Sequence, residues 1–236
     1  DNAKVSQIVD ACTSDTDLKA TEAARILFEN GTDVYKITNL LSAGLMGIEK
    51  NRKVVPTRWA ITATDDMLCS SYKAEVLRLP ALPEFEVFCD TLHGNTLCFI
   101  LIPSNDWRFE MIERWQKKSL WADDEETIII DGEKGKTKRE YSPIGGAYYA
   151  ARLAVLEYLH RRRCCARVIC IRDISGEYWA PLGVWVIREA SHAALAKDPE
   201  RFGTLSEAVS AASVMLDTSF WIPRMGLLKD IREQKT

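Results

Sequence analysis

Several common catalytic and nucleotide-binding motifs are missing from this 236-residue sequence. It contains no GxGxxG loop, no P-loop, no HExxH zinc motif and no GxSxG nucleophile motif. Histidine is also scarce, because His93, His160 and His192 are the only three and they lie far apart. A histidine metal site and a histidine-based catalytic triad are therefore both disfavoured.

The cysteines form no recognisable framework. Seven is an odd number, and no two of them make a CxxC pair, which argues against a disulfide framework and against a cysteine zinc site. The pattern favours reduced, structural thiols in a cytoplasmic protein. The cysteines are residues 12, 69, 89, 98, 164, 165 and 170.

The chain also lacks long hydrophobic runs and a signal peptide. No apolar stretch approaches the roughly 20 residues that a membrane span needs, so we expect no membrane association. The formal net charge of −3 excludes a general attraction to phosphate, and any contact with DNA must therefore be local. Because the chain starts at Asp1 without a methionine and stops at Thr236, we expect a fragment of a longer protein.

What is present predicts one globular domain over residues 1–236, or at most two small, tightly fused cores. Hydrophobic residues make up 47% of the chain and charged residues 28%, as in ordinary globular proteins. Helical and strand patterns alternate without regular βαβ spacing, which predicts an α/β fold of the α+β type, with a mixed, largely antiparallel sheet flanked by helices. Helices are expected at 1–30 (in two parts), 65–79, 147–162, 191–196 and 205–216, strands at 85–88, 96–102, 128–130, 167–172 and 183–187, an extended segment at 54–59 and an amphipathic element with helical spacing at 107–118.

Three unusual strings stand out, at residues 54–66 (VVPTRWAITATDD), 145–153 (GGAYYAARL) and 181–189 (PLGVWVIRE). In this order they resemble the C-terminal region of the archaeal Nre family of DNA repair proteins, and the likeness runs from about residue 33 to residue 190. The resemblance implies a role in DNA repair. It also implies an upstream cysteine-rich, zinc-finger-like segment, of which this chain holds nothing.

The resemblance further implies a C-terminal motif that docks on the sliding clamp PCNA, of the form Gln-x-x-aliphatic-x-x-aromatic-aromatic. Gln234 is the candidate first residue of this motif, with the anchors that follow it missing from the chain. Apolar anchors supply most of the affinity of such a peptide.

The three strings also carry the residues that suit DNA or phosphate binding. A guanidinium beside an indole, as at Arg58 and Trp59, can hold a phosphate and a base, although a buried ion pair of Arg58 with Asp65 or Asp66 and a core Trp59 is an equal alternative. Paired glycines before a helix can cradle an anion, or simply allow a tight turn. The full candidate set is Arg58, Trp59, Gly145, Gly146, Tyr148, Arg152 and Arg188.

Carboxylates supply the competing, enzymatic hypothesis. If they converge, they could hold a divalent metal ion, the candidate cofactor, and the chain would then be a metal-dependent nuclease. A nucleotide-dependent transferase using Arg58 and Glu189 is a further alternative, and so is a non-catalytic scaffold. The catalytic candidates are Asp65, Asp66 and Glu189, and the metal candidates are Asp65, Asp66, Glu110, Asp131 and Glu133.

Overall fold

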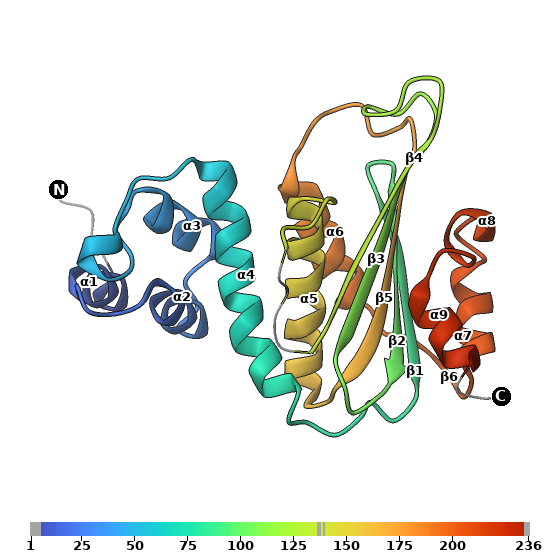
Figure 1. Ribbon diagram of the computed structural model, residues 1–236, viewed down its shortest axis with the longest axis horizontal. Coiled ribbons are helices and arrows are strands. Elements are labelled where there is room, and N and C mark those ends of the chain that lie inside the picture. The colour runs from blue at the N-terminus through green and yellow to red at the C-terminus, as the bar shows by residue number, and fades with distance from the viewer. Residues whose placement is uncertain (1–5, 136–137, 139, 234–236) are drawn as a thin grey trace. The chain divides into compact units, whose positions relative to one another are not determined.

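The computed structural model describes residues 6–135, 138 and 140–233, and it divides the chain into two compact units (Figure 1). Unit 1 comprises residues 1–71 and unit 2 residues 72–236. The boundary falls inside one helix, α4, at Thr57–Val76. The expectation of a single domain over the whole chain remains a prediction, and each unit is described here by itself.

Unit 1 is helical in its described part. Its elements are α1 (Gln7–Ser14), α2 (Ala20–Glu29), α3 (Val34–Ser42), the short 3-10 helix η1 (Glu49–Asn51) and the first part of α4. The apolar positions recur at helical intervals, so each helix buries one face: Val9 and Cys12 in α1, and Ala23, Ala24 and Leu27 in α2.

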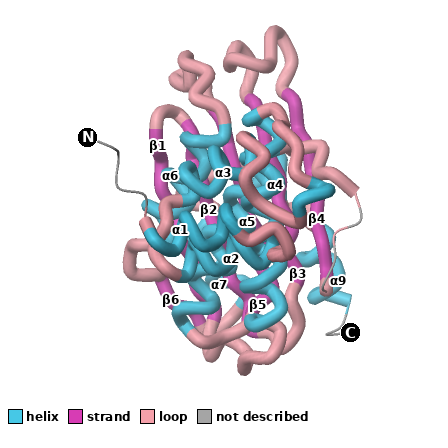
Figure 2. Tube along the Cα trace, turned by 90° about the vertical axis from the view of Figure 1, so that its left-hand side faces the viewer, coloured by secondary structure: helices cyan, strands magenta, loops and turns pink. Residues whose placement is uncertain are grey.

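Unit 2 is built on a sheet whose described strands number six, in the order β4-β3-β5-β2-β1-β6. Figure 2 shows β4 and β6 toward opposite edges. All neighbours pair antiparallel except β3 and β5, which are parallel. The strands are β1 (Phe85–Leu92), β2 (Asn95–Pro103), β3 (Arg108–Trp115), β4 (Thr127–Lys134), β5 (Ala166–Ile174) and β6 (Glu200–Phe202).

Helices cover both faces of this sheet, which explains why its central strands are buried on both sides. The helices α5 (Gly146–Arg162) and α6 (Val184–Leu195) lie on one face, and α7 (Leu205–Ala212), α8 (Thr218–Trp221) and α9 (Gly226–Glu233) lie on the other (Figure 1). The second layer packs Phe220, Trp221 and Leu227 against Ile100 and Ile169 of the sheet.

The predicted fold class is confirmed as a mixed, mostly antiparallel sheet with helices around it. The helix expected at 147–162 and the strands expected at 96–102 and 167–172 match α5, β2 and β5 within a few residues. No helix among the described residues combines the length and the hydropathy that crossing a membrane requires.

The prediction of an extended segment at 54–59 was wrong in its second half, because α4 already begins at Thr57. Proline restricts the residue before it, while its own fixed φ suits the entry of a helix, so Pro56 starts α4 rather than preventing it. Asp65 and Asp66 therefore lie inside the helix and not at its start.

The predicted secondary structure of two further segments was wrong, because one predicted helix is a strand and one predicted strand is a helix. The segment 107–118, expected to have helical spacing, contains strand β3. Its polar residues Glu110, Glu113 and Arg114 are buried in ion pairs or hydrogen bonds, which hides the apolar pattern of a central strand. The segment 183–187, expected as a strand because of its β-branched residues, opens α6 instead, since burial of Val186 and Ile187 overrides their local preference.

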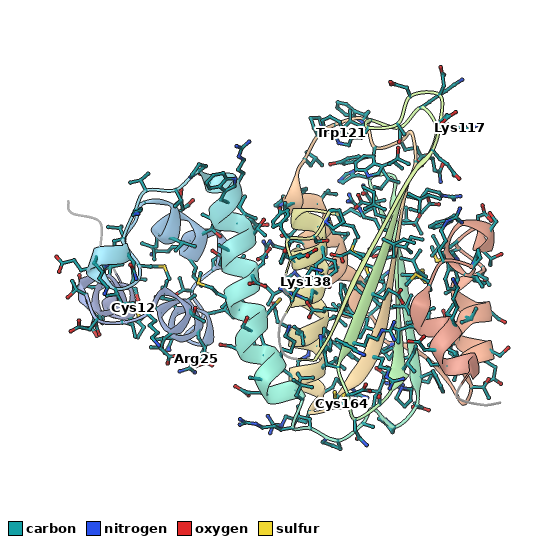
Figure 3. All side chains as sticks on the ribbon, viewed as in Figure 1. Cys12, Arg25, Lys117, Trp121, Lys138 and Cys164 are labelled. Atoms are coloured by element: carbon teal, nitrogen blue, oxygen red, sulfur yellow. A yellow bond between two sulfur atoms is a disulfide. The ribbon has the colours of Figure 1, made fainter. Side chains whose placement is uncertain are left out.

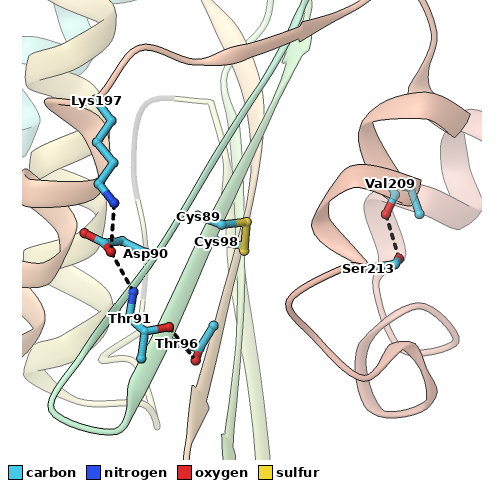
Figure 4. Close-up of a disulfide and its surroundings, with 8 residues drawn as sticks. All are labelled: Cys89, Asp90, Thr91, Thr96, Cys98, Lys197, Val209 and Ser213. Atoms are coloured by element: carbon cyan, nitrogen blue, oxygen red, sulfur yellow. Dashed lines mark hydrogen bonds and ion pairs between the residues drawn. A yellow bond between two sulfur atoms is a disulfide. The ribbon is translucent and has the colours of Figure 1, made fainter.

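One disulfide was not expected. Cys89 and Cys98 face each other across the antiparallel pair β1 and β2, with 4.2 Å between their Cα atoms, and a bond joins them (Figure 4). The odd cysteine count concealed this pair because strand register, rather than sequence spacing, brings the two residues together. The remaining five cysteines are buried and are not joined by disulfides.

Candidate functional site

The second and third strings each place a glycine immediately before a helix, in the same backbone conformation. Gly145 precedes α5 with φ 73° and ψ −148°, and Gly183 precedes α6 with φ 63° and ψ −146°. This region of backbone space is open almost only to glycine. The two helices therefore start in the same way, which requires glycine at both positions.

These two helix starts touch each other. A Cβ added to Gly146 would lie 2.3 Å from Cγ2 of Val184, so the absence of a side chain at Gly146 lets the first turns of α5 and α6 pack closely. The structure thus brings the strings 145–153 and 181–189 together, side by side on one face of the sheet (Figure 1).

The paired helix starts are suited to negative charge. The N-cap residue of each helix is a glycine, which has no side chain that could cap the first amides. Their first amide groups and the positive ends of two helix dipoles consequently favour an anion. Two exposed aromatic side chains flank this surface, Tyr141 at 65% and Trp185 at 45% exposure. Tyr141 places its hydroxyl 3.9 Å from the position of a Cβ on Gly145.

The other candidates of these two strings lie in the interior. Tyr148, Arg152 and Arg188 are all buried, with at most 3% of each exposed. Arg152 donates a hydrogen bond from Nη1 to Glu133 Oε2 (2.5 Å), and its guanidinium lies 5.0 Å from the centre of the Tyr149 ring. These contacts hold α5 on the sheet and give Arg152 a structural role. A binding role for the three residues remains a prediction.

Glu133 is the centre of a buried cluster of charges. Its Oε1 accepts hydrogen bonds from Lys73 Nζ and Trp107 Nε1, both at 2.9 Å, and its Oε2 accepts the bond from Arg152. Burial raises the pKa of Glu133, but the attraction of Arg152 and Lys73 outweighs it, and the pKa lies below its ordinary value. Lys138 lies beside α5 (Figure 3), with its Nζ 4.9 Å from the Tyr148 ring.

The first string lies in unit 1. Arg58 and Trp59 are exposed on α4, with the guanidinium 5.8 Å from the indole ring. Trp59 is 62% exposed, so the alternative that placed it in a core was wrong. Asp65 is buried and Asp66 is exposed. The prediction that all three strings build one site remains open.

The candidate metal ligands in unit 2 have other partners. Glu110 accepts hydrogen bonds from the backbone amides of Gly226 (2.8 Å) and Leu227 (2.7 Å), which docks the start of α9 on β3. Asp131 pairs with Lys138 at 2.7 Å, and Glu133 belongs to the buried cluster. In the part of the chain that the structure describes, no group of three or more histidine, cysteine or acidic side chains could hold a metal ion.

Sequence reasoning missed Gly183, Tyr141 and Trp185. The signal was available, because a glycine precedes a mostly apolar segment in both strings, at 145–151 (GGAYYAA) and at 183–187 (GVWVI). The repeat was overlooked because residues 183–187 were predicted to be a strand, so no second helix start was expected there.

Comparison of the sequence with protein families gives two matches that together cover most of the chain. Residues 1–122 match the family model "Archaeal Nre, N-terminal", and residues 133–236 match "Archaeal Nre, C-terminal". The chain belongs to the archaeal Nre family. The resemblance found in the motifs is confirmed, and the match is wider than the C-terminal region.

Curated members of the Nre family are similar to this chain over nearly all of its length. The DNA repair protein NreA of Archaeoglobus fulgidus is 40% identical over 221 residues, which is 94% of this chain and 56% of the relative. NreA of Haloferax volcanii is 34% identical over 240 residues (100% and 55%), and the DNA repair protein NreB of A. fulgidus is 37% identical over 223 residues (93% and 56%). The chain thus spans about half the length of these relatives. No solved structure matches it.

The boundary between the two Nre regions differs from the boundary between the two units. β1, β2 and β3 lie in the N-terminal region, whereas β5 and β6 lie in the C-terminal region. The sheet of unit 2 therefore needs both Nre regions.

Proposed function

We propose that this Nre chain acts in DNA repair as a binding protein that contacts the DNA backbone at the paired N-termini of α5 and α6. The repair role is supported by the names of the relatives, which are DNA repair proteins NreA and NreB. The contact is supported by one observation above all: two helix starts with the same glycine conformation are packed against each other.

In this proposal the backbone amides at the two helix starts donate hydrogen bonds to phosphate oxygens, and bases stack on the flanking aromatic rings. Backbone amides at a helix start bind phosphate without a lysine or arginine. Tyr141 and Trp185 are exposed aromatic side chains of the kind on which unpaired bases stack. Such a contact suits a chain with a net charge of −3, because it is local and needs no basic surface. Arg58 and Trp59 are the corresponding candidates in unit 1.

The enzymatic alternatives have no comparable support. A metal-dependent nuclease needs converging carboxylates, and Glu110, Asp131 and Glu133 are each engaged with different partners. The transferase built on Arg58 and Glu189 stays a prediction, because the two residues belong to different units. A pure scaffold does not explain why two adjacent helices both start at a glycine in the same conformation. Binding is therefore the function class that we adopt.

The DNA contact can be tested with a matched pair of charge substitutions. Trp185→Glu places a carboxylate in the first turn of α6, where it competes with phosphate for the amides. Trp179→Glu adds the same charge at an exposed tryptophan of the preceding loop. We expect Trp185→Glu to weaken binding of a short single-stranded DNA about tenfold, measured by fluorescence anisotropy, and Trp179→Glu to leave it nearly unchanged. Equal losses in the two variants would contradict the proposed contact.

We further propose recruitment to the sliding clamp PCNA through a C-terminal tail, as the family resemblance implies. Gln234 lies outside the described residues, directly after α9. The chain ending at Thr236 should bind the clamp weakly or not at all. A version extended by the native residues that follow should bind with micromolar affinity or better, a free energy of about −8 kcal/mol, measured by calorimetry. Equal affinity of the two chains would count against Gln234 as the start of the motif.

A further inference from the structure

A half-open cavity of about 290 Å³ lies within unit 1. Its apolar lining combines the start of α2 with the end of α3 and the loop after it. The lining residues are Lys19, Ala20, Leu41, Met46, Gly47, Ile48, Asn51, Lys53 and Val55.

The wall of this cavity is held rigidly by Arg52. Its guanidinium donates hydrogen bonds to three backbone carbonyls, those of Gly47 (2.7 Å), Thr13 (2.7 Å) and Asp15. The amide of Glu49 donates to the carbonyl of Thr16 at 2.9 Å. Together these bonds fix the loop 47–52 against the segment between α1 and α2, so the cavity exists before any ligand arrives.

The opposite wall comes from the residues that precede α4. Val55 exchanges hydrogen bonds with Ser42, from its amide to the Ser42 carbonyl (3.0 Å) and from Ser42 Oγ to the Val55 carbonyl (2.8 Å). Gly44, with φ +72°, lets Lys53 approach so closely that a Cβ on Gly44 would lie 2.9 Å from the Lys53 carbonyl carbon. The start of the first string therefore has a structural task, which is to build this cavity.

The lining defines the chemistry of a ligand. Five of the lining residues are apolar and carry methyl groups, while the charged ones are Lys19 and Lys53, with no carboxylate among the lining side chains. Gly47 faces the start of α2, since a Cβ there would lie 3.7 Å from the amide nitrogen of Ala20. A lining that combines apolar side chains with two lysines suits an apolar group that carries a negative charge. A volume near the lower end of the usual range for ligand sites limits the ligand to a small one.

We propose that this cavity binds a small organic anion, an apolar body bearing one phosphate or carboxylate group. The apolar body contacts Leu41, Met46 and Ile48, and the anionic group lies between Lys19 and Lys53. This ligand site is additional to the proposed DNA contact, because none of its residues belongs to α5 or α6.

Methyl NMR offers a direct test, since the apolar lining residues report on occupancy individually. The probe is phenyl phosphate, and its two halves, phenol and inorganic phosphate, serve as separate probes. We expect phenyl phosphate to shift the methyl signals of Leu41, Met46 and Ile48 in a saturable manner, and to bind more tightly than either half. Saturation with inorganic phosphate alone at the same affinity would mean an adventitious ion only and would overturn the proposal, as would the absence of saturable shifts.

Three variants complete the test. The double variant Lys19→Gln/Lys53→Gln should weaken phenyl phosphate about tenfold. Lys50→Gln removes an exposed lysine of the same loop that does not line the cavity, and should leave the affinity unchanged. Ala20→Leu fills the cavity with apolar atoms and should abolish binding while the helix is kept. An equal loss for Lys50→Gln and the double variant would show general attraction to charge and overturn the site. The DNA titration of Trp185→Glu is independent of these results.

Discussion

At the scale of single residues, the buried carboxylate of Glu133 allows the sharpest prediction. Replacing it with glutamine leaves Lys73 and Arg152 buried without their counter-charge. Breaking a buried ion pair in this way costs about 3–5 kcal/mol of the free energy of unfolding. Urea denaturation of Glu133→Gln should show this loss, while Glu125→Gln, at an exposed position, should change stability by less than about 0.5 kcal/mol. Similar losses of stability in the two variants would contradict the role of Glu133 as the counter-charge of Lys73 and Arg152.

The same carboxylate predicts a dependence of stability on pH. Because the folded-state pKa of Glu133 lies below its ordinary value, its contribution is fully present above the pKa of an unfolded glutamate, about 4.3. It is lost as the pH falls through the lower folded-state pKa. Unfolding measured between neutral and acidic pH should therefore show a steeper loss in the native chain than in Glu133→Gln.

The residue-scale roles were the hardest to predict from sequence. Glu110 and Glu133 were candidates for a metal site, since nothing local reveals their partners. Lys73 lies 60 residues from Glu133, and the amide of Gly226 lies 116 residues from Glu110. Only the fold brings these groups together. The sequence could therefore single out the carboxylates as candidates but could not predict their hydrogen-bond and ion-pair partners.

At the scale of elements, the contact between α5 and α6 can be tested by a double-mutant cycle. Gly146→Ala places a methyl group against Cγ2 of Val184 and should destabilise the protein by about 1–3 kcal/mol, as overpacking does. Adding Val184→Ala restores the space, so the double variant should be more stable than the sum of the two single changes predicts. Thermal unfolding of the four proteins measures the coupling.

Gly203→Ala is the matched control for this cycle. The nearest atom to a Cβ on Gly203 is Glu207 Oε2 at 3.9 Å, and the backbone there is not in the left-handed region. This substitution should have little effect with or without Val184→Ala. Simple additivity of Gly146→Ala and Val184→Ala would mean that the two helix starts do not depend on each other.

Elements were predictable where local pattern and burial agree. β2 and β5 are nearly continuous apolar runs, and α5 has a helical run of alanines and leucines, so all three were found. β3 and α6 were not found, because contacts with distant parts of the chain, rather than local sequence preference, determine their conformation. In β3 buried charges interrupt the apolar pattern, and in α6 β-branched residues lie in a helix.

At the scale of the whole molecule, the sheet predicts that the chain cannot be divided between its two Nre regions. A cut in the exposed loop between β3 and β4 separates β3 from both of its partners, β4 and β5. Pieces comprising residues 1–125 and 126–236 should each lack the dispersed NMR spectrum of a folded sheet. A dispersed strand spectrum from either piece alone would contradict this interdependence. The mixture of helix and strand patterns predicted the α+β class, which is confirmed. No linker in the sequence marks the division near residue 71.

The position of β5 between β2 and β3 has a consequence for protein synthesis. The β1–β2 and β3–β4 pairs can form as soon as residue 134 has left the ribosome, but β5 follows only after α5, at residues 166–174. Until then β2 and β3 each present a row of unpaired backbone groups, and such edges pair readily with other chains. Nascent chains stalled between residues 134 and 166 should accordingly be prone to aggregation, and slow translation of this stretch should reduce the yield of folded protein.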